Sequence, residues 1–382
     1  MIKKLAVGTL AILGILNLNA QTKLAAVNDG NNWGYINTEC EYVIEPQFNH
    51  AKSFVEGKLA IVKIGDKIGA INSKGDLVIE PNYRKIKHFK NGMAPALTMD
   101  DIWIYLDENG GELIIDDAIK IHDFTEEMGL IYAKSNEKFG FVNKSGDWVI
   151  EPQYDKAKSF VNGYSRVLVK GKWGFIDNTG NLILPAIYQD SRDFNDGMAR
   201  VKMNDRWTYI NETGETLNTS EFEKILDFND GFAPIMDKKG RWGLIDKEGN
   251  FSIQPQYTAI KDVSGKYVRV RVGKLWGIAD IEGNMIIDAK YVEVDDFNNG
   301  FAAVRPKKVW GFVNLEGEMI CEAQYVLPAV SLGWGISTGL KRGFVIEELA
   351  RVKSEKKWNY LNTSGELACP GYINAEDFQV VE

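Results

Sequence analysis

Cysteine is scarce in this sequence, and its scarcity excludes one class of fold. The 382 residues include three cysteines, Cys40, Cys321 and Cys369. A chain of this length buries enough apolar surface to fold without disulfides, so a disulfide scaffold is excluded. The odd count leaves at least one thiol free or bonded to another chain. Cys321 and Cys369 share one position of the repeat described below, where we expect core thiols, with a bridge between them as the alternative.

Histidine and the sequence motifs of catalysis are scarce as well. His50, His88 and His122 lack the spacing of metal ligands, so we interpret them as surface residues of linkers. No C-x-x-C, H-E-x-x-H or phosphate-binding loop occurs in the sequence. Acidic residues are plentiful, but nothing selects a pair of them for glycoside chemistry. We therefore expect no catalytic residues, no metal and no cofactor.

Positive charge and long apolar runs are also limited. The 45 Lys and Arg are outnumbered by 53 Asp and Glu, which gives a formal charge of −8 and no basic surface for nucleic acid. After the N-terminal segment, no stretch reaches the roughly 20 apolar residues of a membrane-spanning helix. We therefore expect neither a nucleic-acid partner nor a transmembrane anchor.

The N-terminal segment is typical of a secretory signal peptide. It reads "MIKKLAVGTLAILGILNLNA", with two lysines, an apolar run over Leu5–Leu16 and small residues up to Ala20. We expect residues 1–20 to be removed, so that the mature chain begins at Gln21. The protein is then exported, to the periplasm, the cell surface or the medium.

A phrase of 34 to 36 residues recurs along the remaining chain, over 21–382. The segment "KWGFIDNTGNLILPAIY" at 172–188 matches "KFGFVNKSGDWVIEPQY" at 138–154. A fixed period of this size indicates a solenoid, a propeller or a similar array. We call the residue that opens each phrase its anchor. The anchors are Trp33, Ile68, Trp103, Phe139, Trp173, Trp207, Trp242, Trp276, Trp310 and Trp358.

Each repeat predicts a three-stranded antiparallel meander. Asn or Asp stands four residues after every anchor, and Gly stands seven after it in nine repeats, a pattern of type I turns. Each Asn or Asp is alone in its turn, which disfavours Ca²⁺ binding. Cys40 replaces the turn Gly of the first repeat, so we expect Cys40→Gly to stabilise the fold modestly. Eleven residues after the anchor lies a ladder of residues expected to be buried, which includes Ile114 and is broken at Asn218.

Aromatic residues fifteen and twenty-one positions after the anchors predict packing between repeats. One small meander cannot bury an apolar face alone, so neighbours must stack. We expect an all-β fold of about ten units stacked as an open twisted β-solenoid, because neither end of the chain is obviously missing a strand to pair with. A closed, many-bladed ring like a propeller is the alternative.

The recurring phrase resembles the WG-repeat family. The Trp-Gly dipeptide, the Asx-x-x-Gly turn, "VIEPQY" and the F-x-x-G linker carry this resemblance over about Leu24 to Phe378. It implies an interaction module, found mostly in bacteria and often exported, with no catalytic residues to carry over. Ile104, Thr208 and Asn359 depart from the pattern, because each replaces the Gly of the dipeptide.

Two functions fit this pattern. We favour a monomeric, non-enzymatic scaffold that binds a protein or glycan of the cell envelope, because like residues recur evenly. The alternative is a carbohydrate-active enzyme with a site in a divergent repeat. An insertion at about 326–343 carries Trp334, Lys341 and Arg342, which are candidates for partner binding. The other interpretation of this insertion is a cap on the last stacked repeats.

Overall fold

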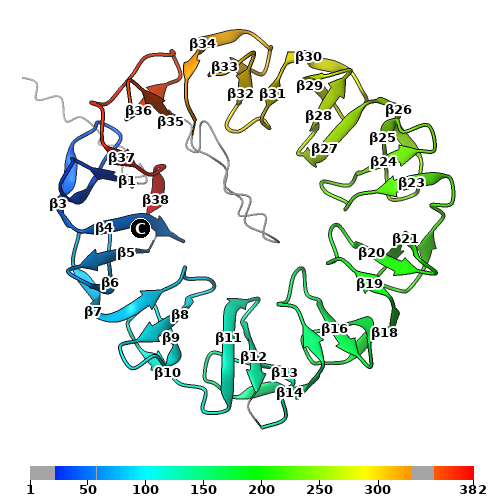
Figure 1. The fold of residues 1–382 in the computed structure, drawn as a ribbon, viewed down its shortest axis with the longest axis horizontal. Coiled ribbons are helices and arrows are strands. Elements are labelled where there is room, and N and C mark those ends of the chain that lie inside the picture. Colours follow the sequence, from blue (N-terminus) through cyan, green and yellow to red (C-terminus); the bar gives the residue numbers. More distant parts are fainter. Residues whose placement is uncertain (1–21, 57, 134, 328–347) are drawn as a thin grey trace, which may run out of the picture.

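The protein folds into many small antiparallel sheets arranged around a ring (Figure 1). The computed structural model describes residues 22–56, 58–133, 135–327 and 348–382. Within these ranges the strands form nine sheets, and no segment is helical. The proposed signal peptide and nearly all of the insertion, with Trp334, Lys341 and Arg342, lie outside the described residues. The prediction of an all-β repeat fold is confirmed.

The first three repeats form two sheets, and the last repeat forms a small one. The first sheet holds β1 (Thr22–Asn28), β2 (Trp33–Ile36), β3 (Tyr42–Phe48), β37 (Asn374–Ala375) and β38 (Gln379–Val381). The second holds β4 (His50–Val55), β5 (Leu59–Ile64), β6 (Lys67–Ile71), β7 (Leu77–Ile86), β8 (Met93–Thr98), β9 (Trp103–Asp107) and β10 (Glu112–Leu113). The last repeat contributes β35 (Leu349–Ser354) and β36 (Lys357–Asn362).

The six sheets between them share one topology, four strands paired in chain order. Three of them hold β11 (Ala118–Thr125), β12 (Met128–Ala133), β13 (Phe139–Val142), β14 (Trp148–Tyr154); β15 (Lys156–Ala157), β16 (Ser165–Val169), β17 (Lys172–Ile176), β18 (Leu182–Tyr188); and β19 (Asp190–Ser191), β20 (Met198–Met203), β21 (Arg206–Asn211), β22 (Thr216–Leu217). The others hold β23 (Phe222–Ile225), β24 (Ala233–Asp237), β25 (Trp242–Ile245), β26 (Phe251–Tyr257); β27 (Ala259–Ser264), β28 (Tyr267–Val272), β29 (Leu275–Asp280), β30 (Met285–Tyr291); and β31 (Glu293–Val294), β32 (Phe301–Arg305), β33 (Trp310–Asn314), β34 (Met319–Tyr325).

The Gly after the anchor permits a close approach of two strands. A Cβ placed on Gly34 would lie 2.5 Å from the carbonyl oxygen of Ile44 and 2.8 Å from the nitrogen of Pro46. The fourth strand of a regular repeat therefore crosses the anchor strand closely, through a bulge, and runs for seven residues or more. The same close approach recurs at Gly69, Gly140, Gly174, Gly243, Gly277 and Gly311.

Two repeats without this Gly, the third and the sixth, have a truncated fourth strand in a shifted register. Where Ile104 and Thr208 supply a Cβ, β10 and β22 have two residues each. The residue ten positions after the anchor then turns toward the core and is half-buried, as Leu113 is opposite Tyr105. Leu217 does the same in the sixth repeat, which explains the break at Asn218.

Ile114 is consequently not part of the buried ladder, and that prediction is wrong. Its exposed fraction is 55%, compared with 3% for Ile44 at the same position of a regular repeat. The register shift turns its side chain to the opposite face, because side chains alternate along a strand.

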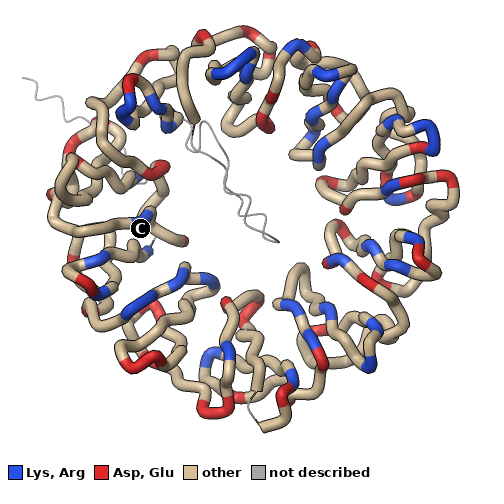
Figure 2. The backbone as a smooth tube through the Cα atoms, in the orientation of Figure 1, with Lys and Arg blue, Asp and Glu red and all other residues tan. Residues whose placement is uncertain are grey.

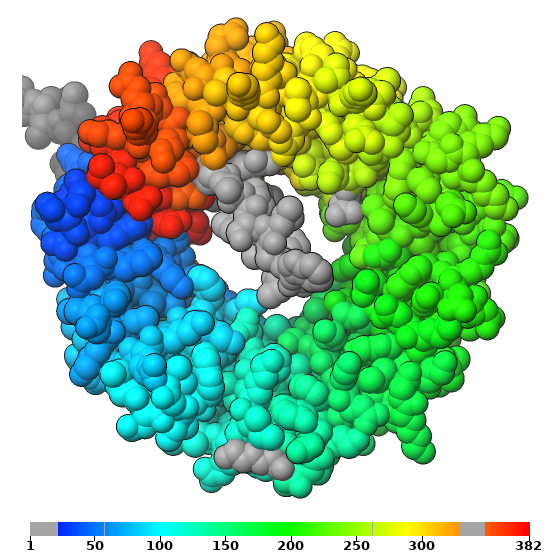
Figure 3. Space-filling view, in the orientation of Figure 1, coloured from blue at the N-terminus to red at the C-terminus, as the bar shows by residue number. Residues whose placement is uncertain are grey.

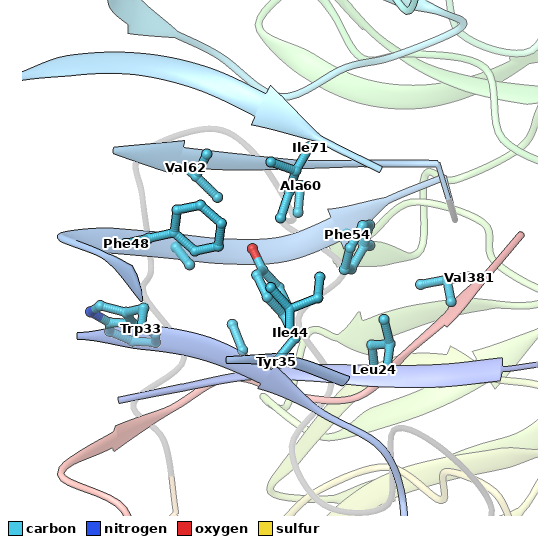
Figure 4. Packing of buried hydrophobic residues seen from close by; sticks show 12 residues of the cluster. Leu24, Trp33, Tyr35, Ile44, Phe48, Phe54, Ala60, Val62, Ile71 and Val381 are labelled. Atoms are coloured by element: carbon cyan, nitrogen blue, oxygen red, sulfur yellow. The ribbon is translucent and has the colours of Figure 1, made fainter. Parts of the chain in front are cut away.

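Aromatic contacts join neighbouring sheets, as the linker residues predicted. In the first repeat Tyr35 packs against Phe54, with ring centroids 5.1 Å apart, and donates its hydroxyl to the carbonyl of Lys52. Figure 4 shows this cluster, to which Leu24 from β1 and Val381 from β38 also contribute. The first hydrophobic cluster is thus completed by the end of the chain.

The two ends of the described chain meet, so the expectation of an open solenoid is wrong. β1 pairs with both β37 and β38, and Cys40 forms a disulfide with Cys369. In later repeats, the linker that precedes a repeat provides the first strand of its sheet. In the first repeat, the C-terminal segment provides this strand, as β37 and β38 beside β1. The alternative, a closed ring, describes this arrangement, and Figure 3 shows the opening that the coloured residues surround.

The disulfide also revises two predictions about cysteine. Cys40 has a φ of 67°, as its place in the turn predicts, but its bond to Cys369 removes the expectation that Cys40→Gly stabilises the fold. Cys321 is a buried free thiol, and the alternative bridge between Cys321 and Cys369 does not form.

Candidate functional site

A cleft opens beside the anchor of the third repeat. Its volume is about 390 Å³, and it lies where β9 faces the start of β11. Isoleucines dominate its lining, with one Trp and two carboxylates. The lining residues are Asp101, Ile102, Trp103, Ile114, Ile115, Asp116, Ala118, Ile119 and Ile121.

The cleft exists because the fourth strand of this repeat stops early. In a regular repeat the fourth strand reaches back to the anchor, and an aromatic side chain packs there, as Phe48 does opposite Trp33. In the third repeat β10 ends at Leu113, and the equivalent of Phe48 is Ala118. The loss of one aromatic side chain and of most of a strand leaves the space open.

Three isoleucines at the cleft are much more exposed than core residues. The exposed fractions are 50% for Ile102, 55% for Ile114 and 52% for Ile119. Burying such side chains is favourable by about 1.5 to 3 kcal/mol each, so covering this cluster would be favourable.

Acidic residues lie on both sides of the cleft. Asp101 follows Asp100 in the turn before β9, and Asp116 precedes Asp117 in the link to β11. Figure 2 shows acidic segments along this part of the ring. Asp101 pairs with Arg84, but both side chains are well exposed, so this ion pair is weak and exchangeable.

The Trp103 ring is less accessible than the isoleucines. It is half-buried, and the Lys87 ammonium lies 5.2 Å from its centroid. Most other anchors carry a cation or imidazole over the ring in the same way. These are Trp33 with His50, Trp173 with Arg166, Trp207 with Arg192 and Arg200, Trp276 with Lys261 and Arg271, Trp310 with Arg305, and Trp358 with Arg351 and Lys353.

The arginines over these rings belong to the architecture. Arg166 pairs with Asp193 at 2.5 Å, and Arg200 pairs with Asp227 at the same distance, in each case across the boundary to the next sheet. Each guanidinium is also within 6 Å of its anchor ring. The repeated arrangement ties sheet to sheet and marks no single place on the ring.

The comparison with protein families decides what kind of chain this is. Seven segments match the family described as WG containing repeat, at 33–67, 68–98, 139–173, 173–207, 207–241, 242–276 and 276–307. They cover more than half of the sequence. The chain is a WG-repeat protein. The matches leave out 99–138, the segment that contains the cleft.

Solved structures place this WG-repeat protein among β-propeller-like folds. A crystal structure of a eukaryotic initiation factor is similar with a TM-score of 0.50 and 12% identity, covering 78% of this chain and 95% of that one. The designed protein Ika8 matches at 0.37 and 14% identity, covering 66% and 91%. BamB from Moraxella catarrhalis matches at 0.31 and 12%, covering 68% and 88%. No curated protein matches the chain.

Other candidate groups in this WG-repeat protein do not converge. Burial lowers the pKa of His122 to about 4, and desolvation also lowers that of His88. Asp377 has its pKa raised to about 6 by burial, but it pairs with Arg351 at the junction of the chain ends, away from the cleft. Among the described residues, no three His, Cys, Asp or Glu side chains are grouped to hold a metal, and no helix could span a membrane.

Sequence reasoning about WG repeats missed the cleft, although one feature of the sequence indicates it. Ala118 stands where most repeats have an aromatic residue, and Ile104 stands where most have Gly. The two substitutions occur in the same repeat, and together they predict that the fourth strand cannot cover the anchor.

Proposed function

We propose that this WG-repeat protein is an exported, non-enzymatic scaffold that binds a partner protein at the bacterial cell envelope. The observation that carries the proposal is the cleft, because it leaves exposed apolar side chains and carboxylates where a regular repeat has a full fourth strand. Proteins bind one another through such apolar clusters with polar rims. We also propose that ten repeats make up the closed ring and that the protein is a monomer.

Two features support export. The N-terminal segment is typical of a signal peptide. The bond between Cys40 and Cys369 is of a kind that persists in oxidising compartments and is rare in the cytosol. Whether the site of action is the periplasm, the cell surface or the medium is a matter for fractionation, with a mature N-terminus expected at Gln21.

A protein partner fits the cleft better than a glycan. Sugars stack on open aromatic faces, and Lys87 lies over the Trp103 ring. The exposed isoleucines offer aliphatic contact, and the aspartates favour cations. No comparable observation favours the alternative function, a carbohydrate-active enzyme.

The test is affinity capture from an envelope extract with the mature chain, 21–382, as bait. A second WG-repeat protein of similar size and charge serves as the matched bait. We expect a specific protein that binds again after purification with saturable, one-to-one stoichiometry. If purified candidates bind both baits alike, or none binds, the proposed scaffold function is wrong.

A further inference from the structure

The unpaired edge of β9 suggests how the cleft is occupied, and this inference rests on the proposed function. We propose that the cleft binds an extended segment of the partner by strand addition at Trp103. The segment continues the sheet where β10 stops, places aliphatic side chains against the isoleucines and carries Lys or Arg toward the aspartates.

The backbone direction at Trp103 is set by its neighbours. On one side of β9, the amide of Thr98 donates to the carbonyl of Ile102, and on the other side Tyr105 is opposite Leu113 of β10. Hydrogen-bonding directions alternate along an antiparallel strand, so the amide and carbonyl of Trp103 face the same side as those of Tyr105. That side is the cleft.

Regular repeats show what normally occupies this edge. Trp33 is opposite Phe48, and Trp173 is opposite Tyr188, so the fourth strand pairs with the anchor itself. In the part of the chain that the structure describes, no strand pairs with Trp103 on this side, because the pairing of β10 with β9 ends at Leu113 opposite Tyr105. A partner strand would restore the pairing that every regular repeat has.

The sixth repeat is an internal comparison. It also lacks the Gly and has a two-residue fourth strand, β22. There, however, the hydroxyl of Thr219 donates to the carbonyl of Trp207 at 3.3 Å, and that of Thr208 donates to the carbonyl of Leu217 at 3.0 Å. Side chains thus cover the edge in the sixth repeat. The third repeat has Ile115 in place of Thr219, and an isoleucine side chain cannot donate a hydrogen bond.

The lining determines the chemistry of the segment. An added strand presents alternate side chains to one face, and the exposed Ile102, Ile114 and Ile119 would bury aliphatic groups there. Asp101 and Asp116 at the two sides favour cations. Arg84 holds Asp101 only in an exposed ion pair, which an incoming Lys or Arg can replace.

The probe is a fluorescent, N-acetylated, C-amidated hexapeptide that alternates lysine and valine. Three further peptides act as comparisons: one with glutamate in place of lysine, and two that are N-methylated at every second residue, in either register. We expect the parent to bind, the glutamate form to bind at least about tenfold more weakly, and at least one N-methylated form to lose binding, since N-methylation removes the amide donors.

A matched pair of variants localises the binding. Ile119 lines the cleft and Ile187 of β18 does not, but their exposed fractions are 52% and 54%. Ile119→Arg should weaken peptide binding at least about tenfold, equivalent to about 1.4 kcal/mol, whereas Ile187→Arg should leave it unchanged. Thermal melting of both variants checks that they fold.

The outcomes separate this inference from the proposed function. If the parent peptide does not bind, if Ile119→Arg retains it, or if both N-methylated forms bind as well as the parent, strand addition in the cleft is wrong. The same conclusion follows if Ile119→Arg dissociates a dimer in sedimentation, because the occupant is then a second copy, or if an oligosaccharide displaces the peptide. If a captured partner still binds the Ile119→Arg variant, the scaffold function is supported, but the cleft is not its binding site.

Discussion

The disulfide between the first and last repeats gives the sharpest test of the closed ring. Cys40 and Cys369 are separated by 329 positions in the sequence. In the chain-entropy account, cross-linking a loop of that length stabilises the folded state by up to about 5 to 6 kcal/mol. The measured effect should be smaller, about 2 to 4 kcal/mol, because repeats can unfold locally and the pairing of β1 with β37 and β38 remains.

The perturbation is Cys369→Ser, followed by urea denaturation with and without reductant. We expect a lower midpoint without reductant and no further loss when reductant is added, whereas reductant should lower the midpoint of the unmodified protein. Thiol titration of the unmodified protein, denatured without reductant, should find one thiol, that of Cys321. Three titratable thiols, or an unchanged midpoint, would refute the reasoning.

The same background tests the turn at Cys40. Its φ of 67° costs on the order of 1 kcal/mol in a residue other than Gly. Without a bond to preserve, Cys40→Gly in the Cys369→Ser background should raise stability by about that amount. In the unmodified protein the same change should lower it, because the lost cross-link outweighs the relieved strain. A decrease in both backgrounds would contradict the assigned turn.

Three further predictions concern the ring. Gly243→Ala should destabilise by at least about 1 to 3 kcal/mol in urea, because its Cβ would lie 2.5 Å from the carbonyl oxygen of Ile253. Trp276→Ala should cost less than the 3–5 kcal/mol typical of a fully buried Trp, because this ring is half-buried; hydrogen exchange should show the loss in neighbouring repeats first. Burial holds the pKa of His122 at about 4, below the 6.5 of the unfolded chain, so the unfolded state binds more protons between these values. The melting temperature should therefore fall as pH drops from 6.5 to 4, and His122→Gln should reduce that fall, with His50→Gln as the control for losing an imidazole.

Local pattern determined much of this protein. The period, the Asx-x-x-Gly turns and the apolar alternation predict small antiparallel sheets, because turn and strand preferences depend on a few neighbouring residues. The positive φ at Cys40 follows from the same logic, since every other repeat has Gly at that position. The packing of Phe54 against Tyr35 was also foreseeable, because the aromatic residues recur with the period.

Only the tertiary structure decided the rest. Closure depends on small rotations between many repeats, whose sum no local pattern contains, so the pairing of β1 with β38 and the bond between Cys40 and Cys369 were not predicted. The cleft arose from a shift of one residue in the register of β10. Such a shift follows from a backbone contact that Gly permits and Ile104 prevents, and it turns Ile114 outward because strand side chains alternate between two faces.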